Sequence, residues 1–247
     1  MGEHSERTKD IRHGSIHRLY FGLTLPATFS LLVLGLYHFF DGIFVGQWVN
    51  PEALGAIGLV YPFTLVNNGI FMLIGVGCAS LLSRALGSGD RKTVDSIFGN
   101  LLLLNILLSG SQVVLGLVYA ERIVAFLGGE GRMLEYGTRY LRLIVIGSPF
   151  VNFASSANVV IRAEGRMRNA MLILSSGALL NILLDPLFLG VFGLGVTGAA
   201  LATALSQAVT ALVTVVYFVR GHSAVTIDPS RIRFTRHISE ILGVGIS

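Results

Sequence analysis

The chain alternates long apolar stretches with short polar ones along most of its length. Short glycine-rich segments at 87–90, 162–166 and 190–198 separate some of the apolar stretches, and short connections make consecutive helices antiparallel neighbours. A helix needs about 20 apolar residues to cross a bilayer, and six runs reach that length: 19–46, 54–84, 94–120, 136–161, 168–190 and 196–219. The pattern predicts an all-α integral membrane protein, a bundle of six transmembrane helices.

Composition supports this assignment. Of the 247 residues, 53% are hydrophobic and only 13% are charged, with a mean hydropathy of +0.72, whereas about a quarter of the residues of a soluble domain are charged. The single cysteine, Cys78, excludes a disulfide framework and a cysteine-based metal site, and we expect it to pack in the core. The sequence GSGD at 87–90 lacks the Lys and Ser/Thr of a phosphate-binding loop, so nucleotide binding is not expected.

The basic residues predict how the helices are oriented. The net charge of +4 could suggest a nucleic-acid partner, but the Lys and Arg lie in short clusters between the apolar runs. With the N-terminus in the cytoplasm, fourteen of the eighteen Lys and Arg fall on the inner side, as the positive-inside rule requires. Only four fall outside: Arg122, Arg132, Arg139 and Arg142. We therefore expect a plasma-membrane protein with a cytoplasmic N-terminus and no nucleic-acid partner.

The same pattern divides the chain into three parts. Residues 1–18 form a basic cytoplasmic segment, residues 19–220 the six-helix lobe, and residues 221–247 a cytoplasmic linker with the start of a truncated second lobe. Leu19 and Gly22 in LYFGLT are echoed by Leu242 and Gly245 in LGVGIS. The echo predicts a second repeat related to the first by an axis along the membrane normal.

Two carboxylates lie deep inside the apolar runs. Asp41 and Asp185 each stand about five residues before the outer end of an outward-running helix, which places them at a similar depth. Acidic residues within a membrane are costly and by default mark ion or substrate sites. The sequence therefore predicts that the two aspartates share one cavity, which serves as an ion or substrate site.

Each aspartate has a polar companion one helical turn earlier. Tyr37 precedes Asp41 by four residues and Asn181 precedes Asp185 by four, so each pair shares a helix face. Thr203, on the sixth helix, comes near the same depth. His38, a lone imidazole beside Asp41, is expected to be interfacial or to pack.

Two prolines are expected to bend the helices that carry the aspartates. Pro26 and Pro186 have no N–H to donate to the carbonyls of Gly22 and Ile182. Bent helices in a membrane bundle commonly line water-filled space.

The chain resembles a known family. YHFFDGIFVG at 37–46, VVIRAEGRMRNAMLI at 159–173 and GALLNILLDPLFLGVFGLGVTGAALAT at 177–203 are similar to the multidrug and toxic compound extrusion (MATE) transporters, most like the DinF-type branch. The resemblance implies twelve helices in two six-helix lobes that expel organic cations in exchange for H⁺ or Na⁺. It implies that the polar network of the N-terminal lobe consists of Tyr37, Asp41, Asn181, Asp185 and Thr203.

The resemblance also sets expectations for further residues and partners. Where Na⁺ is the coupling ion, Asp41 and Asp185 are expected to bind it, and no other cofactor is expected. Asn158 matches a further asparagine of the family network, but it stands only four residues from Arg162 at the inner face, away from the aspartates. The expected partners are membrane lipid, a small organic cation, and a missing second lobe or a second copy.

Three alternatives stay open. A flippase of lipid-linked oligosaccharides could share this fold, but it would be expected to have basic groups in its cavity for phosphate. A membrane-embedded enzyme would need a catalytic constellation, which the sequence does not offer, so the chain is not expected to be an enzyme. The third alternative is a half that does not transport alone and pairs with another chain.

Overall fold

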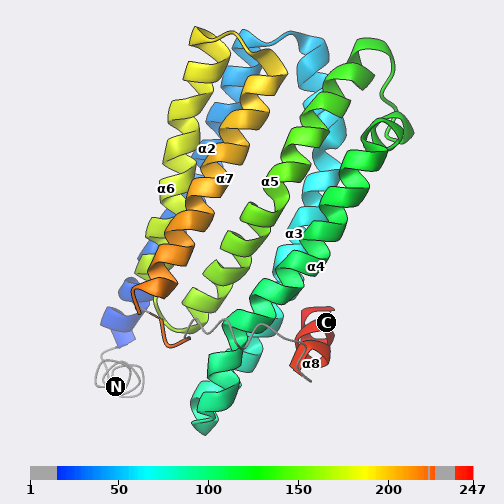
Figure 1. Ribbon diagram of the computed structural model, residues 1–247. Coiled ribbons are helices and arrows are strands. Elements are labelled where there is room, and N and C mark those ends of the chain that lie inside the picture. The colour runs from blue at the N-terminus through cyan, green and yellow to red at the C-terminus, as the bar shows by residue number, and fades with distance from the viewer. Residues whose placement is uncertain (1–15, 222, 226–236, 247) are drawn as a thin grey trace.

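Six long helices run up and down in the computed structural model, which describes residues 16–221, 223–225 and 237–246 (Figure 1). A shorter helix follows near the C-terminus, and a six-residue π-helical segment, η1, continues the fifth long helix. The elements are α2 (Ile16–Trp48), α3 (Pro51–Ser88), α4 (Arg91–Phe126), α5 (Gly131–Ala163), α6 (Met167–Asp185), η1 (Pro186–Val191), α7 (Gly195–Val219) and α8 (His237–Ile246).

The long helices alternate in direction, so the bundle has two ends. We call the end where α2 begins the near end and the opposite one, where α2 stops at Trp48, the far end (Figure 1). At the far end Asn50 caps α3, accepting a hydrogen bond from the N–H of Ala53 at 2.8 Å. At the near end Gly89 closes α3 with a positive φ of 74°, a conformation that glycine adopts without strain.

The predicted fold class is confirmed. Six helices of the described chain are long and apolar enough to span a membrane, and each contains most or all of one predicted run. α2, α3, α4 and α5 extend beyond their predicted runs at both ends. Residues 1–15 of the predicted basic segment lie outside the described residues, as do 222, 226–236 and 247 of the predicted linker.

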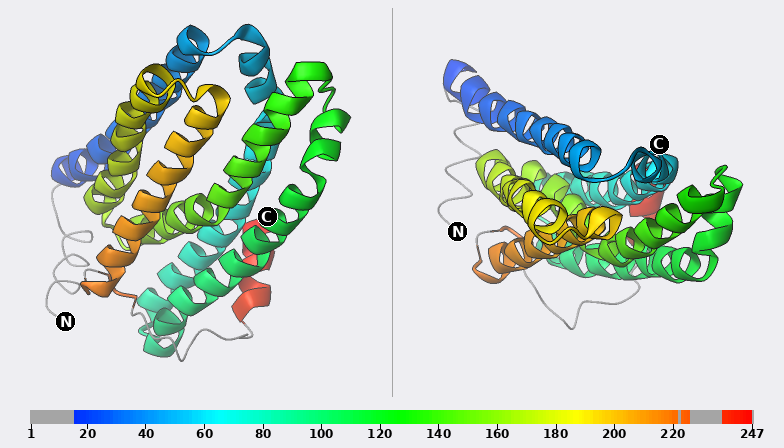
Figure 2. Two further views of the ribbon diagram at one scale, coloured as in Figure 1. Left: turned by 45° about the horizontal axis from the view of Figure 1, so that its top comes forward. Right: turned by 90° about the horizontal axis from the view of Figure 1, so that it is seen from above.

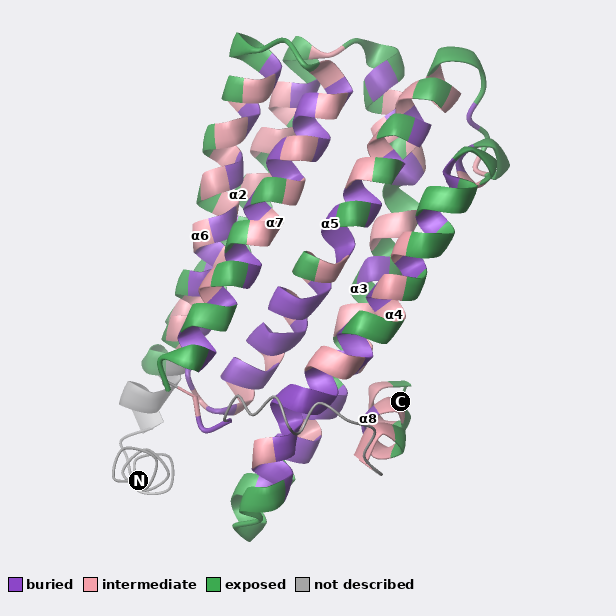
Figure 3. Ribbon diagram, in the orientation of Figure 1, coloured by how far each residue is buried: buried purple, intermediate pink, exposed green. Residues whose placement is uncertain are grey.

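The fourth long helix, α5, occupies the middle of the bundle. It packs against α3, α4 and α7, and Figure 3 shows it with more buried turns than the peripheral helices. The largest buried cluster joins α3, α4 and α5 toward the near end and includes Ile74, Leu82 and Ile97. Cys78 belongs to this cluster and is fully buried, as predicted.

The first helix, α2, lies at the edge. It packs mainly against α6 and makes few contacts with α3 (Figure 2). Large side chains such as Phe21, Leu32 and Phe39 are more than half exposed. A lipid or protein neighbour is therefore needed to cover α2.

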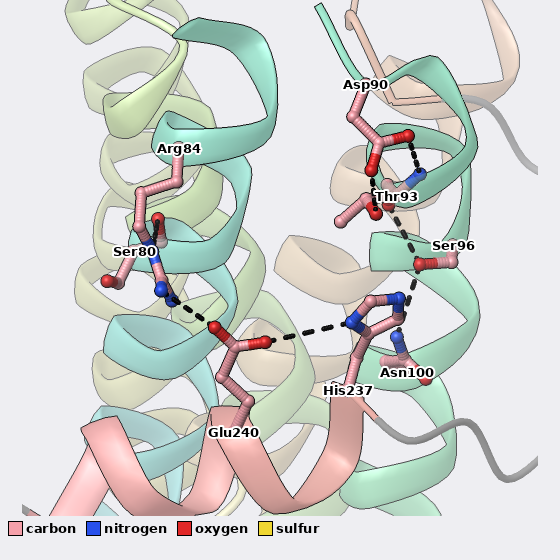
Figure 4. A network of polar contacts seen from close by, with 8 residues as sticks. All are labelled: Ser80, Arg84, Asp90, Thr93, Ser96, Asn100, His237 and Glu240. Carbon is pink, nitrogen blue, oxygen red and sulfur yellow. Dashed lines mark hydrogen bonds and ion pairs between the residues drawn. The ribbon is translucent and has the colours of Figure 1, made fainter. Parts of the chain in front are cut away.

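The short helix α8 docks on the near ends of α3 and α4. Glu240 pairs with Arg84 of α3 at 2.7 Å and lies 3.8 Å from His237 (Figure 4). Ile241 is fully buried in the main cluster. Next to this contact, Asp90 caps α4 by accepting hydrogen bonds from the N–H and hydroxyl of Thr93 at 3.2 and 2.7 Å, which lowers the pKa of Asp90.

Candidate functional site

Asp185 lies where regular helix stops. α6 ends at this residue and η1 begins at Pro186, which cannot donate a backbone hydrogen bond. Beyond it the N–H of Phe192 reaches back five residues to the carbonyl of Leu187 at 2.9 Å. The predicted disturbance at Pro186 thus takes the form of a π-helical segment, a feature often found at functional sites.

The carboxylate of Asp185 is buried and only partly satisfied. When the Asn181 amide is turned to face this carboxylate, Asn181 Nδ2 donates to Asp185 Oδ2 at 2.9 Å. Asn181 Oδ1 then accepts a hydrogen bond from the backbone N–H of Thr203 at 3.3 Å. Asp185 has no exposed surface. Its other oxygen, Oδ1, has no hydrogen-bond partner among the described residues, so it is left for a proton, an ion or a substrate.

The second aspartate, Asp41, is brought to the same place from α2. Asp41 and Asp185 are close enough for their charges to interact. Tyr37 interacts with both carboxylates, but its hydrogen bond is to the side chain of Thr203 on α7. The structure thus gathers five predicted residues at one location: Tyr37, Asp41, Asn181, Asp185 and Thr203.

Tyr140 of α5 is a sixth member that the sequence did not reveal. Its hydroxyl lies close enough to Asp41, Tyr37 and Asp185 for electrostatic interaction. The signal was present, because Tyr140 lies near the far end of α5, at a depth comparable to that of the aspartates. A tyrosine near the end of a membrane helix usually marks only the interface, however.

A cavity of about 140 Å³ extends from this cluster toward the near end, between α2, α5, α6 and α7. Tyr37, Asn181 and Thr203 line it, and its other walls carry apolar and uncharged polar side chains. Three polar groups in its lining, Ser175 Oγ, Ser206 Oγ and Gln207 Oε1, have no hydrogen-bond partner among the described residues. The cavity can therefore accept a ligand with both apolar and polar parts.

The remaining predicted residues lie elsewhere. Asn158 is at the near end, where Nδ2 donates to the carbonyl of Ala170 at 2.8 Å and Oδ1 accepts from Arg162 Nε at 2.9 Å. It links α5 to α6 and stays apart from the aspartates, as its depth in the sequence indicated. His38 is exposed on α2, and α2 continues as a helix through Pro26, whose carbonyl accepts from Ser30 Oγ at 2.8 Å.

A buried amide network between α3, α4 and α5 was also missed. Asn152 Nδ2 donates to Ser109 Oγ at 2.9 Å and to Asn67 Oδ1 at 3.1 Å, and Ser109 Oγ donates to Asn105 Oδ1 at 3.1 Å. Asn105 in turn donates to the carbonyl of Pro149 at 3.1 Å. Interhelical hydrogen bonds of this kind hold membrane helices together.

Another polar cluster closes the near end of α5 and α7. Glu164, in the connection from α5 to α6, accepts hydrogen bonds from Ser223, from the N–H of Ala224 at 3.2 Å and from the Tyr217 hydroxyl at 3.4 Å. Arg166 lies 3.9 Å away. Burial raises the pKa of Glu164 although these hydrogen bonds and Arg166 act in the opposite direction.

Comparison with known proteins gives consistent matches. The MatE family model matches residues 26–187. The multidrug export protein MepA of Staphylococcus saprophyticus is 32% identical over 229 residues, covering 90% of this chain and 49% of that protein. MepA of Staphylococcus aureus strain MRSA252 is 29% identical over 224 residues, covering 90% and 50%.

Solved structures agree. An outward-facing multidrug resistance MATE family transporter is 31% identical with a TM-score of 0.86, and the match covers 92% of this chain and 51% of that one. The chain spans about half the length of the curated relatives it matches. Its six helices correspond to one lobe of these transporters, and the predicted resemblance is confirmed at the level of the family: the chain belongs to the MATE family of transporters.

Proposed function

We propose that this chain forms one lobe of an antiporter that exports organic cations in exchange for H⁺ or Na⁺. The observation that supports this most directly is the pair Asp41 and Asp185, which lie together within the membrane-spanning bundle; Asp185 Oδ1 has no hydrogen-bond partner in the described part of the chain. The relatives named above are transporters, in keeping with the expectation that the chain is not an enzyme. Their description as multidrug exporters favours drug export over the flippase alternative.

The coupling follows from competition for the same carboxylates. A proton or Na⁺ bound at Asp41 and Asp185 neutralises the charge that would hold a cationic substrate in the adjacent cavity. Binding of the ion from outside then favours release of the substrate, because the ion stabilises the conformation in which the substrate is bound more weakly. Each ligand shifts the equilibrium between two conformations only by the difference between its affinities for them. The π-helical segment after Asp185 and the proline in α2 are the places where helix geometry can change.

The proposed orientation places the N-terminus and the near end in the cytoplasm. The near-end connections 89–90 and 164–166 are flanked by Arg84, Arg91, Lys92, Arg162 and Arg168, whereas the far-end connections 49–50 and 192–194 carry no basic residue. The carboxylates then lie toward the outer leaflet, and the 140 Å³ cavity extends inward from them.

Efflux from proteoliposomes tests the proposal. The chain is reconstituted into proteoliposomes, either alone or together with a second lobe of a related transporter. The proteoliposomes are loaded with a fluorescent organic cation, and an inward H⁺ or Na⁺ gradient is imposed across their membrane. We expect gradient-dependent efflux that the double substitution Asp41→Asn, Asp185→Asn abolishes, with His38→Gln as a control on the same helix. Efflux by the double mutant at the wild-type rate would refute the role of the aspartates.

The same experiment decides between two forms of the protein. Efflux by the chain alone would show that no second lobe of different sequence is required. Efflux that requires the added lobe would show that the chain works as half of a larger antiporter. The exposed large side chains of α2 are consistent with either partner.

A further inference from the structure

The far end of the bundle contains a second cavity, separate from the aspartates. It measures about 590 Å³ and lies between α4, α5 and the first turn of α7. On α5, residues 134, 135, 138 and 142 share the helix face that lines it. Tyr140, which faces the aspartates, lies on another side of α5. The two cavities therefore use different faces of the same helix.

The walls of this cavity carry charges of both signs. Glu121 comes from α4, and Glu135, Arg139 and Arg142 come from α5. Glu135 and Arg139 lie 3.5 Å apart and compensate each other. Among the described residues, no ion pair engages Glu121 or Arg142, so one negative and one positive side chain are left for a ligand.

Two further groups favour an anion beside Arg142. Thr138 is about nine-tenths buried and lines the cavity, yet its Oγ1 has no hydrogen-bond partner among the described residues. Thr197, in the first turn of α7, also lines the cavity, and no side chain caps this 25-residue helix. The free N–H groups of an uncapped helix start attract negative charge.

One helical turn deeper in the bundle, the surface next to these polar groups is apolar. Leu117 lies one turn inward from Glu121 and is 37% exposed, and Ile146 lies one turn inward from Arg142 and is 49% exposed. A ligand seated on Glu121 and Arg142 would therefore continue along an apolar surface. This arrangement matches an amphiphile whose polar head lies at the membrane boundary.

We propose that this cavity binds the head group of a zwitterionic phospholipid that carries a primary ammonium group. Arg142, Thr138 and the start of α7 hold the phosphate, Glu121 holds the ammonium group, and the acyl chains follow Leu117 and Ile146. In the proposed orientation the lipid belongs to the outer leaflet. The site also explains why Arg142 stands on the side of the membrane where basic residues are scarce.

Native mass spectrometry of the full chain released from detergent can test this. The purified protein is titrated with phosphatidylethanolamine or phosphatidylglycerol of equal chain length, and the bound fractions are compared. We expect the ethanolamine lipid to bind more tightly. Arg142→Gln should weaken binding of both lipids at least roughly tenfold, since the lost charged hydrogen bond to the phosphate contributes about 1.4 kcal/mol or more. Glu121→Gln should remove the preference for ethanolamine.

Matched variants make the outcome decisive. Arg122→Gln removes a neighbouring charge at the same end of α4 but outside the cavity lining, so it should leave binding unchanged. Thr138→Val, which keeps the shape of the side chain, should weaken binding of both lipids. Equal loss in the Arg122 and Arg142 variants would overturn the site, and equal binding of the two lipids would overturn the role of Glu121. Displacement of the lipid by soluble glycerophosphoethanolamine would assign the site to a soluble zwitterion instead.

Discussion

Two serines of α4 lie two residues apart but differ in what their hydroxyls do. Ser109 is fully buried and joins Asn105 to Asn152 of α5, whereas Ser111 is exposed and donates to the carbonyl of Leu108 at 2.8 Å. We expect Ser109→Ala to reduce stability by roughly 0.5–1.5 kcal/mol, because Asn105 Oδ1 loses its donor and Asn152 Nδ2 loses one of its acceptors. Ser111→Ala should have no measurable effect. Thermal unfolding in detergent compares the two, and equal melting temperatures would show that the network does not contribute.

Glu164 predicts a pH effect whose sign follows from its burial. Its pKa in the folded protein is raised above the ordinary value of 4.5, so the folded state binds the proton more tightly than the unfolded state does. The contribution of Glu164 to stability is therefore largest in acid and falls as the pH rises from about 4.5 through the raised pKa.

A neutral variant isolates this contribution. Glu164→Gln cannot ionise, so the melting temperature of the wild type relative to this variant should decrease with rising pH. Thermal unfolding measured in parallel for both proteins across this range checks the sign. A difference that increases with pH would show that the hydrogen bonds from Ser223 and Ala224 outweigh desolvation.

At the scale of single residues, the sequence reveals polar or charged side chains that stand in otherwise apolar segments. Asp41 and Asp185 could be found because a carboxylate inside an apolar run is costly, and their companions followed from helical spacing. Tyr140 and Asn152 could not be found this way. A single tyrosine or asparagine is unremarkable in a membrane helix, and the partners of Tyr140 and Asn152 come from other helices.

At the scale of elements, the crossing of α8 over α3 depends on two glycines. A Cβ atom at Gly77 would collide with the carbonyl of Ile241, and one at Gly245 would collide with the carbonyl of Leu73. Gly77→Ala should therefore separate the helices, at a cost of roughly 1–3 kcal/mol. Gly69→Ala, on the same helix, meets nothing within 4 Å and serves as the control. Hydrogen exchange in α8 should become faster only in the Gly77 variant, and unchanged protection would contradict this account.

Element boundaries were predictable where they depend on local chemistry. Apolar runs, glycine-rich connections and the capping residues Asn50 and Asp90 are all present in the sequence. Two features were not predicted in this form. Pro186 indicated a disturbed helix, but its π-helical geometry depends on hydrogen bonds such as that from the N–H of Phe192 to the carbonyl of Leu187. α8 has only ten residues, too few for a membrane-length run, and its docking depends on contacts with α3.

At the scale of the whole molecule, the orientation in the membrane is predicted from the distribution of basic residues along the sequence, and labelling experiments can test it. Surface labelling of introduced cysteines tests it in a Cys78→Ala background, which removes the only native thiol. Gln47 is exposed at the far end and Ser88 is exposed at the near end. With the near end in the cytoplasm, a membrane-impermeant maleimide should label Gln47→Cys in intact cells and Ser88→Cys only after lysis. The reverse pattern would place the aspartates toward the cytoplasm and would require the direction of coupling to be reversed.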